Sequence, residues 1–171
     1  MADPMLKNLK TTRLIAASAL GLLLSGCLGL GNDVDEIVQR QCPSVTIVAT
    51  ADKLVVEGAS FEITEARLKC FINRDNEDEL LAAVTLSGRA GARKQVPLFL
   101  ASLGENDAIL GRTQYKVTLA QGDFTLTLPN YRYGKKGNEQ KPRLVSGFVL
   151  TQAQLSANRA AYRKTLGLSN W

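Results

Sequence analysis

The chain has 171 residues, a formal net charge of +5 at pH 7 and no histidine. Without histidine it lacks the commonest general base and the commonest metal ligand, which excludes the usual serine and cysteine triads. Residues 1–26 carry a net charge of +2, which leaves +3 (5 − 2) on the rest of the chain. A charge of this size is mild and does not by itself indicate a nucleic-acid partner. The sequence also lacks a Gly-x-Ser-x-Gly motif and a set of zinc ligands. We therefore expect a protein that is not an enzyme and that binds no cofactor or metal.

The first 26 residues have the pattern of an export signal. Three basic residues among the first 13 precede an apolar stretch at 14–26, and that stretch ends in small residues. Cys27 follows directly, and the sequence Leu-Ser-Gly-Cys at 24–27 resembles the lipobox of bacterial lipoproteins. The resemblance implies cleavage before Cys27, acylation of Cys27 and anchorage of the remaining chain in a membrane.

Two alternatives to a lipoprotein signal are an uncleaved membrane anchor and ordinary secretion. The 19 residues at 14–32 carry no charge, and a helix needs about 20 residues to span a bilayer. However, the dense apolar part ends at Leu24, which is a length more typical of a signal. We therefore divide the chain into a signal peptide at 1–26, an acylated cysteine with a flexible tether at 27–41, and a folded domain at 42–171.

Cys42 and Cys70 remain once Cys27 is assigned to acylation. In an exported, oxidising compartment two remaining cysteines most simply form a disulfide, and two separate buried thiols are the alternative. Alternation along residues 61–73 places Cys70 on the apolar face of a strand, together with Thr64 and Leu68. A bridge between the two cysteines would stabilise the fold by roughly 3–4 kcal/mol in the chain-entropy model.

The domain has the pattern of antiparallel strands separated by turns. Apolar and polar residues alternate in most segments, and turn residues separate the segments at short spacing. A basic glycine loop is expected at 88–94. The predicted strands cover 44–49, 54–57, 61–73, 80–86, 96–103, 108–119, 124–128 and 143–150. The predicted fold class is mainly β, an antiparallel β-sandwich of immunoglobulin-like general plan with a C-terminal α-helix.

The predicted helix begins at about residue 151. Thr151 and Gln154 have the spacing of a capping box, in which each side chain bonds to the backbone amide of the other residue. Leu155, Tyr162 and Leu166 then fall on one face of the helix.

A basic stretch at 131–142 precedes the last predicted strand. It carries two tyrosines together with Arg132, Lys135, Lys136 and Lys141. Basic residues mixed with aromatic residues can bind nucleic acid or anionic headgroups, but the export signal argues against nucleic acid. We expect a mobile loop, with a contact to lipid, cell wall or a protein partner as the alternative.

The order of these features resembles the BamF-type lipoproteins of alphaproteobacteria, which are accessory components of the outer-membrane β-barrel assembly machinery. The resemblance rests on the lipobox, on Cys42-Pro43 before the first strand, on Cys70 after a long strand, and on Val-Pro-Leu-Phe at 96–99. The tail at 147–159 is similar to the family's ending, G-F-x-L-T-x-x-Q-L-x-x-N-R. The segment at 54–60 departs from the family, which has a Gly-Arg-Asp-rich segment there.

The resemblance implies an outer-membrane lipoprotein that faces the periplasm and assists outer-membrane protein assembly or envelope integrity. Its implied partners are the membrane, through the lipid anchor, and the β-barrel assembly complex. Leu28 follows the lipidated cysteine, so the aspartate of the inner-membrane retention signal of enteric lipoproteins is absent. The alternative is a tethered domain that binds cell wall, lipid or an exported protein, or that inhibits an enzyme.

Overall fold

The structure is a computed structural model that describes Val38, residues 40–137 and residues 142–168. The predicted signal peptide, Cys27 and Lys141 lie outside the described residues. Part of the predicted tether lies within them: Val38 is buried, and the two residues before Cys42 are helical. In the part of the chain that is described, no helix is both long enough and apolar enough to cross a membrane.

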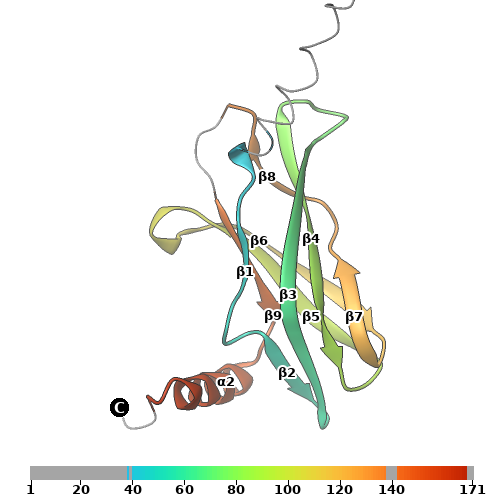
Figure 1. The fold of residues 1–171 in the computed structure, drawn as a ribbon, viewed down its shortest axis with the longest axis vertical. Coiled ribbons are helices and arrows are strands. Elements are labelled where there is room, and N and C mark those ends of the chain that lie inside the picture. The colour runs from blue at the N-terminus through green and yellow to red at the C-terminus, as the bar shows by residue number, and fades with distance from the viewer. Residues whose placement is uncertain (1–37, 39, 138–141, 169–171) are drawn as a thin grey trace, which may run out of the picture.

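The described chain is mainly β and forms two sheets, followed by the helix α2, Gln152–Thr165 (Figure 1). The first sheet has the strand order β1-β9-β5-β6, in which β1 and β9 run parallel and the other neighbours antiparallel. Its strands are β1 Val45–Ile47, β5 Lys94–Leu103, β6 Ile109–Leu119 and β9 Arg143–Phe148.

The second sheet has the order β2-β3-β4-β7, and β8 also pairs with β4. Its strands are β2 Lys53–Val56, β3 Ala59–Ile72, β4 Glu79–Ala90, β7 Gly122–Thr127 and β8 Tyr131–Lys135. A turn of 3-10 helix, Glu105–Asp107, connects β5 to β6. The expectation of a mainly β chain with a C-terminal helix is confirmed.

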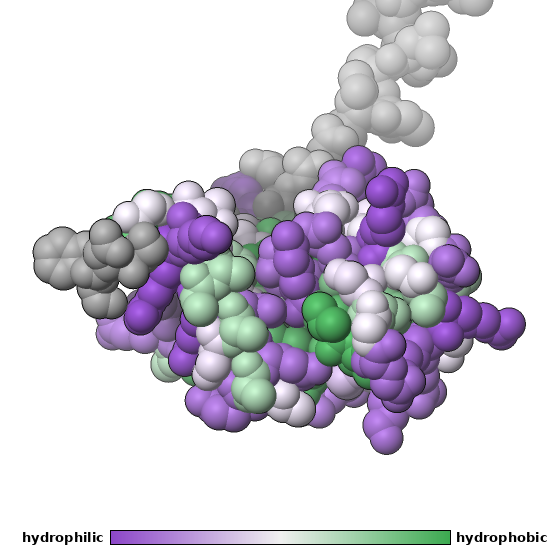
Figure 2. Space-filling model, turned by 90° about the horizontal axis from the view of Figure 1, so that it is seen from below, coloured by the Kyte–Doolittle hydropathy of each residue, from purple (hydrophilic) through white to green (hydrophobic). Residues whose placement is uncertain are grey.

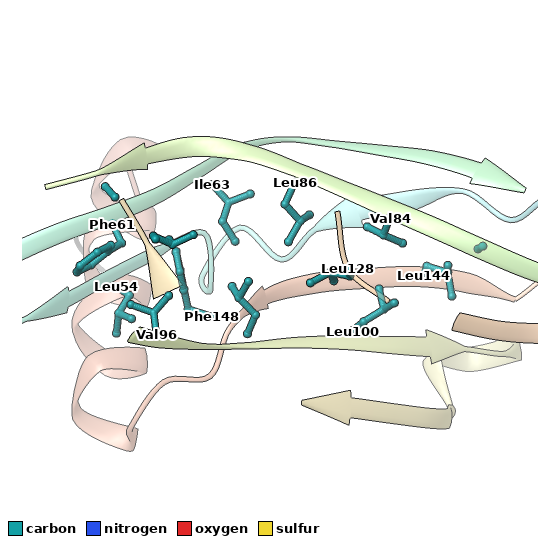
Figure 3. Close-up of a cluster of buried hydrophobic side chains, with 14 of the residues drawn as sticks. Leu54, Phe61, Ile63, Val84, Leu86, Val96, Leu100, Leu128, Leu144 and Phe148 are labelled. Carbon is teal, nitrogen blue, oxygen red and sulfur yellow. The ribbon is translucent and has the colours of Figure 1, made fainter. Parts of the chain in front are cut away.

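The hydrophobic core lies between the two sheets, and Figure 3 shows side chains from both of them converging there. Because side chains alternate along a strand, each strand can turn one row of apolar residues inward. Leu86 and Phe61 come from the second sheet, and Leu100 and Phe148 from the first; all four are at most 1% exposed. Burial of these apolar side chains is the main force that holds the sheets together.

A β-bulge in the β3–β4 hairpin changes which residues face the core. The pairing register shifts between Ile63 and Glu65, so Ile63 is buried before the bulge while Leu68 packs against the core after it. The prediction that Thr64 shares the apolar face is wrong, because Thr64 is exposed and donates to the Ser87 carbonyl at 3.3 Å. Strict alternation cannot anticipate the extra residue of a bulge.

The predicted glycine loop at 88–94 is mostly strand. Its first three residues belong to β4 and its last residue begins β5, so the turn covers only 91–93. Gly88 lies where β3 approaches closely: a Cβ at this position would lie 1.9 Å from the carbonyl oxygen of Glu62. This glycine therefore permits close strand packing beside the bulge and does not form a turn.

Cys42 and Cys70 form a disulfide, and their Cα atoms are 5.8 Å apart. Cys42 lies just before β1 of the first sheet, and Cys70 lies in β3 of the second. The bond therefore joins the two sheets near the start of the described chain.

Two leucines test whether burial between the sheets determines stability. Leu100 is 0% exposed and Leu110 is 62% exposed. We expect Leu100→Ala to lower the free energy of unfolding by about 2–5 kcal/mol, because it removes buried methyl groups and leaves a cavity. Leu110→Ala is the matched control and should change stability by less than about 0.5 kcal/mol. Urea unfolding followed by circular dichroism measures both, and equal effects would contradict the placement of the core.

Candidate functional site

The basic stretch at 131–142 is in part a strand, so the prediction of a mobile loop there is wrong for its first half. β8 pairs with the beginning of β4. The Tyr131 hydroxyl lies 3.0 Å from Ser102 Oγ of the other sheet, and Tyr133 is 8% exposed. The two tyrosines face inward at alternate positions of the strand. The aromatic residues of this stretch therefore have a packing role.

Arg132 forms an ion pair, because its guanidinium lies 3.0 Å from Glu79 Oε1. Asn73 also donates a hydrogen bond to the Glu79 carboxylate at 2.9 Å. Both bonds hold the pKa of Glu79 below its usual value, and the bond from Asn73 has the larger effect.

The lysines of this stretch also lie beside acidic groups. Lys135 is the register partner of Glu79, and the Lys136 amide donates to the Asp78 carbonyl at 2.7 Å. The turn between β3 and β4 carries further carboxylates at Asp75 and Glu77. Of the four cations proposed from the sequence, the three that the structure describes therefore lie near a carboxylate-rich turn, which reduces their attraction for an anionic surface.

The other end of the molecule carries α2, whose start is fixed by the predicted capping box. Thr151 Oγ1 accepts a hydrogen bond from the Gln154 amide at 3.3 Å, and Gln154 Oε1 accepts one from the Thr151 amide at 2.9 Å. This pair satisfies backbone N–H groups that the first turn of a helix leaves without partners. The expectation of a capped helix beginning at about residue 151 is confirmed.

Side-chain amides attach α2 to the second sheet and to the loop before β2. Gln154 Nε2 donates to the Val55 carbonyl at 3.0 Å. Asn158 Nδ2 donates to the Thr50 carbonyl at 3.0 Å and to the Lys53 carbonyl at 2.8 Å. No residue of α2 is fully buried, so these directional bonds do much of the positioning of the helix.

A groove of about 280 Å³ lies between the beginning of α2 and the outer surface of the first sheet. Figure 2 shows the molecule from the α2 end, with apolar surface visible between hydrophilic side chains. Leu155 and Arg159 of α2 line one side, and Phe99 of β5 and Arg112 of β6 line the other. Most of the remaining lining is apolar: Val48, Ala51, Phe148, Val149 and Leu150.

Gly147 lies under the floor of the groove, where Ala51 and Phe99 approach its Cα closely. A Cβ at this position would lie 2.7 Å from the Ala51 Cβ and 3.2 Å from the Phe99 ring. The absence of a side chain therefore lets the Phe99 ring and the Ala51 segment approach β9 from its outer side.

Arg112 and Arg159 give the groove its charge. The Arg112 guanidinium carbon lies 5.2 Å from the centre of the Phe99 ring, which is a cation–π geometry. Neither arginine forms an ion pair or hydrogen bond with another residue that the structure describes. The groove therefore combines an apolar floor with two guanidinium groups whose N–H donors have no acceptor in the described part of the chain.

The groove was not predicted from the sequence, although part of it coincides with the tail at 147–159. Gly147, Leu155 and Arg159 belong to that tail, whereas Phe99 and Arg112 come from distant strands without a local signal. Among the described residues, no three cysteine, aspartate or glutamate side chains are grouped to hold a metal ion. The arrangement suits binding of an anionic group next to an apolar one.

Comparison with known proteins finds no family model, no curated protein and no solved structure that matches the chain. The resemblance to BamF-type lipoproteins therefore stays a prediction.

The Glu79 cluster predicts a pH dependence of stability. Because folding lowers the pKa of Glu79, its stabilising contribution is present above the usual pKa of 4.5 and is lost as the pH falls through the folded-state pKa. We expect Glu79→Gln to be less stable than the wild type at about pH 6, with the difference shrinking toward pH 3. Thermal melts across this range measure it, with the exposed Glu105→Gln as the control. A difference that does not change with pH would contradict the assignment.

Proposed function

We propose that this chain is a non-enzymatic bacterial outer-membrane lipoprotein that faces the periplasm and serves as an accessory or scaffold in outer-membrane protein assembly or envelope integrity. The lipobox-like sequence at 24–27 is the observation that carries the proposal. The Cys42–Cys70 disulfide supports it, because disulfides persist mainly in oxidising compartments outside the cytosol.

In this proposal the folded domain is a β-sandwich of immunoglobulin-like general plan. The shared core between two sheets supports the sandwich. The antiparallel pairs that dominate both sheets, with β1 and β9 as the parallel exception among the described strands, are compatible with it.

The two ends of the domain support a tethered adaptor. The described chain begins at the end where β3 turns into β4, whereas α2 lies at the opposite end (Figure 1). A chain anchored through Cys27 would therefore hold its domain by one end and leave the α2 end away from the attachment. This geometry also favours the second candidate, a tethered domain that binds an exported protein, because the groove lies at that free end.

Acylation is tested by labelling cells with a radioactive or clickable palmitate analogue. We expect the wild-type protein to incorporate the label and Cys27→Ala to lose it, because the lipid is attached to that sulfur. Cys42→Ala is the matched control and should keep the label. A wild-type protein that carries no label, or a Cys27→Ala protein that keeps it, would contradict the lipoprotein assignment.

The partner is tested by affinity purification from detergent-solubilised envelopes. We expect proteins of the β-barrel assembly complex to be enriched over the amount recovered with an unrelated lipoprotein carrying the same tag. Equal recovery with both baits would show that the accessory role in barrel assembly is wrong.

A further inference from the structure

We propose that the groove between α2 and the first sheet binds a peptide segment of an exported protein in which an acidic side chain lies next to a large apolar one. The inference rests on the proposed function only in placing the partner in the periplasm. Its chemistry follows from the groove itself: two arginines supply positive charge, and the surfaces between them are apolar.

Two arginines, unpaired among the described residues, face each other across an apolar surface in this groove. Some of the other described cations, such as Lys116 and Arg163, form no ion pair. Six others pair with nearby carboxylates: Lys53 with Glu62, Arg67 with Glu65, Arg89 with Asp123, Lys94 with Glu57, Arg132 with Glu79 and Arg143 with Asp107. Among the residues that the structure describes, the two groove arginines have no carboxylate partner, and no acidic residue lines the groove. An anionic occupant would complete their hydrogen bonding.

The apolar floor determines what accompanies the anion. Arg112 lies over the Phe99 ring, and its N–H groups have no hydrogen-bond acceptor among the described residues. Phe99 and Leu155 lie on either side of the remaining space. A free inorganic anion would leave these surfaces in water, whereas an apolar neighbour of the acidic group would cover them.

The size and position of the groove favour a peptide over a membrane. A volume of about 280 Å³ accommodates one or two side chains and is too small for a folded element. α2 also continues past the groove with exposed apolar residues on the face of Leu155: Tyr162 is 41% exposed and Leu166 is 54% exposed. An extended segment can occupy the groove and continue along this face, at the end of the domain remote from the start of the described chain.

The test uses the full chain in detergent micelles and fluorescence anisotropy of labelled peptides. The probe peptide carries aspartate flanked by leucine and phenylalanine between Gly-Ser spacers. One matched peptide replaces the aspartate with asparagine, and another replaces both apolar residues with alanine. We expect the probe to bind and each matched peptide to bind at least about tenfold more weakly, since both the charge-assisted bonds and the apolar contact are required.

Variants of the protein locate the binding site. Arg112→Glu and Arg159→Glu should each weaken binding of the probe at least about tenfold. Lys164→Glu is the control, because it makes the same charge change on α2 about 140° around the helix from Arg159. Arg159→Gln, which removes the charge without reversing it, should weaken binding in the same direction. Thermal melts of all variants verify that they remain folded.

Three outcomes would overturn the inference: a probe that does not bind, equal loss of binding in Lys164→Glu, or equal affinity for the probe and the asparagine peptide. Vesicles of phosphatidylglycerol and phosphatidylcholine test the lipid alternative. If only the groove variants reduce vesicle binding while the probe does not bind, the site recognises lipid and the peptide inference is wrong. The peptide-binding assay does not require acylation. Absence of palmitate labelling would therefore contradict the lipoprotein assignment and leave the peptide inference standing.

Discussion

Pairing of β4 with three other strands is the constraint on which the second sheet depends. β3 lies along one edge of β4, and β7 and β8 pair with successive parts of its other edge. Every second side chain of β4 from Leu80 to Leu86 faces the core, and together these side chains form a continuous apolar row. Without β4, neither β7 nor β8 would have a neighbour in that sheet. Gly88 lies beside the bulge of β3, where a side chain on β4 would collide with the backbone of β3. Glycine at this position therefore lets β4 stay paired with β3 along the bulge.

Side-chain hydrogen bonds, more than apolar burial, hold α2 in place. α2 contributes no fully buried residue, so apolar burial alone does not hold it. Its amide side chains instead bond to carbonyls in β2 and the segment before it, which the sheet holds in fixed positions. Hydrogen bonds of this kind add modest stability but define direction well. They hold the start of α2 beside β2, and in this position Leu155 and Arg159 line the groove opposite the first sheet.

Local chemistry predicted much of this structure. The capping box at Thr151 requires only four residues, and the pairing of Cys42 with Cys70 follows from counting cysteines. Prediction failed where a residue's role depended on distant strands. The sequence predicts loops at Gly88 and Tyr131, because glycine and mixed basic residues are common in loops. A bulge and an inter-sheet hydrogen bond determine their actual positions. The groove was missed for the same reason, since Arg112 becomes important only when folding brings α2 opposite β6.

The charges beside β8 and the charges in the groove have different surroundings. At the end where the described chain begins, cations and carboxylates lie together, and their fields largely cancel over the distance of a Debye length. At the α2 end the two groove arginines have no carboxylate partner among the described residues and lie beside apolar surface, where reduced access of water strengthens their attraction for an anion. β3 alone has 14 residues and extends about 45 Å. Because Val38 is buried, the tether that remains covers residues 28–37 and adds at most roughly 33–36 Å when fully extended. An anchored domain of this shape would present the groove well away from the membrane surface, so its charge would act on a periplasmic partner and only weakly on the headgroups beside its anchor.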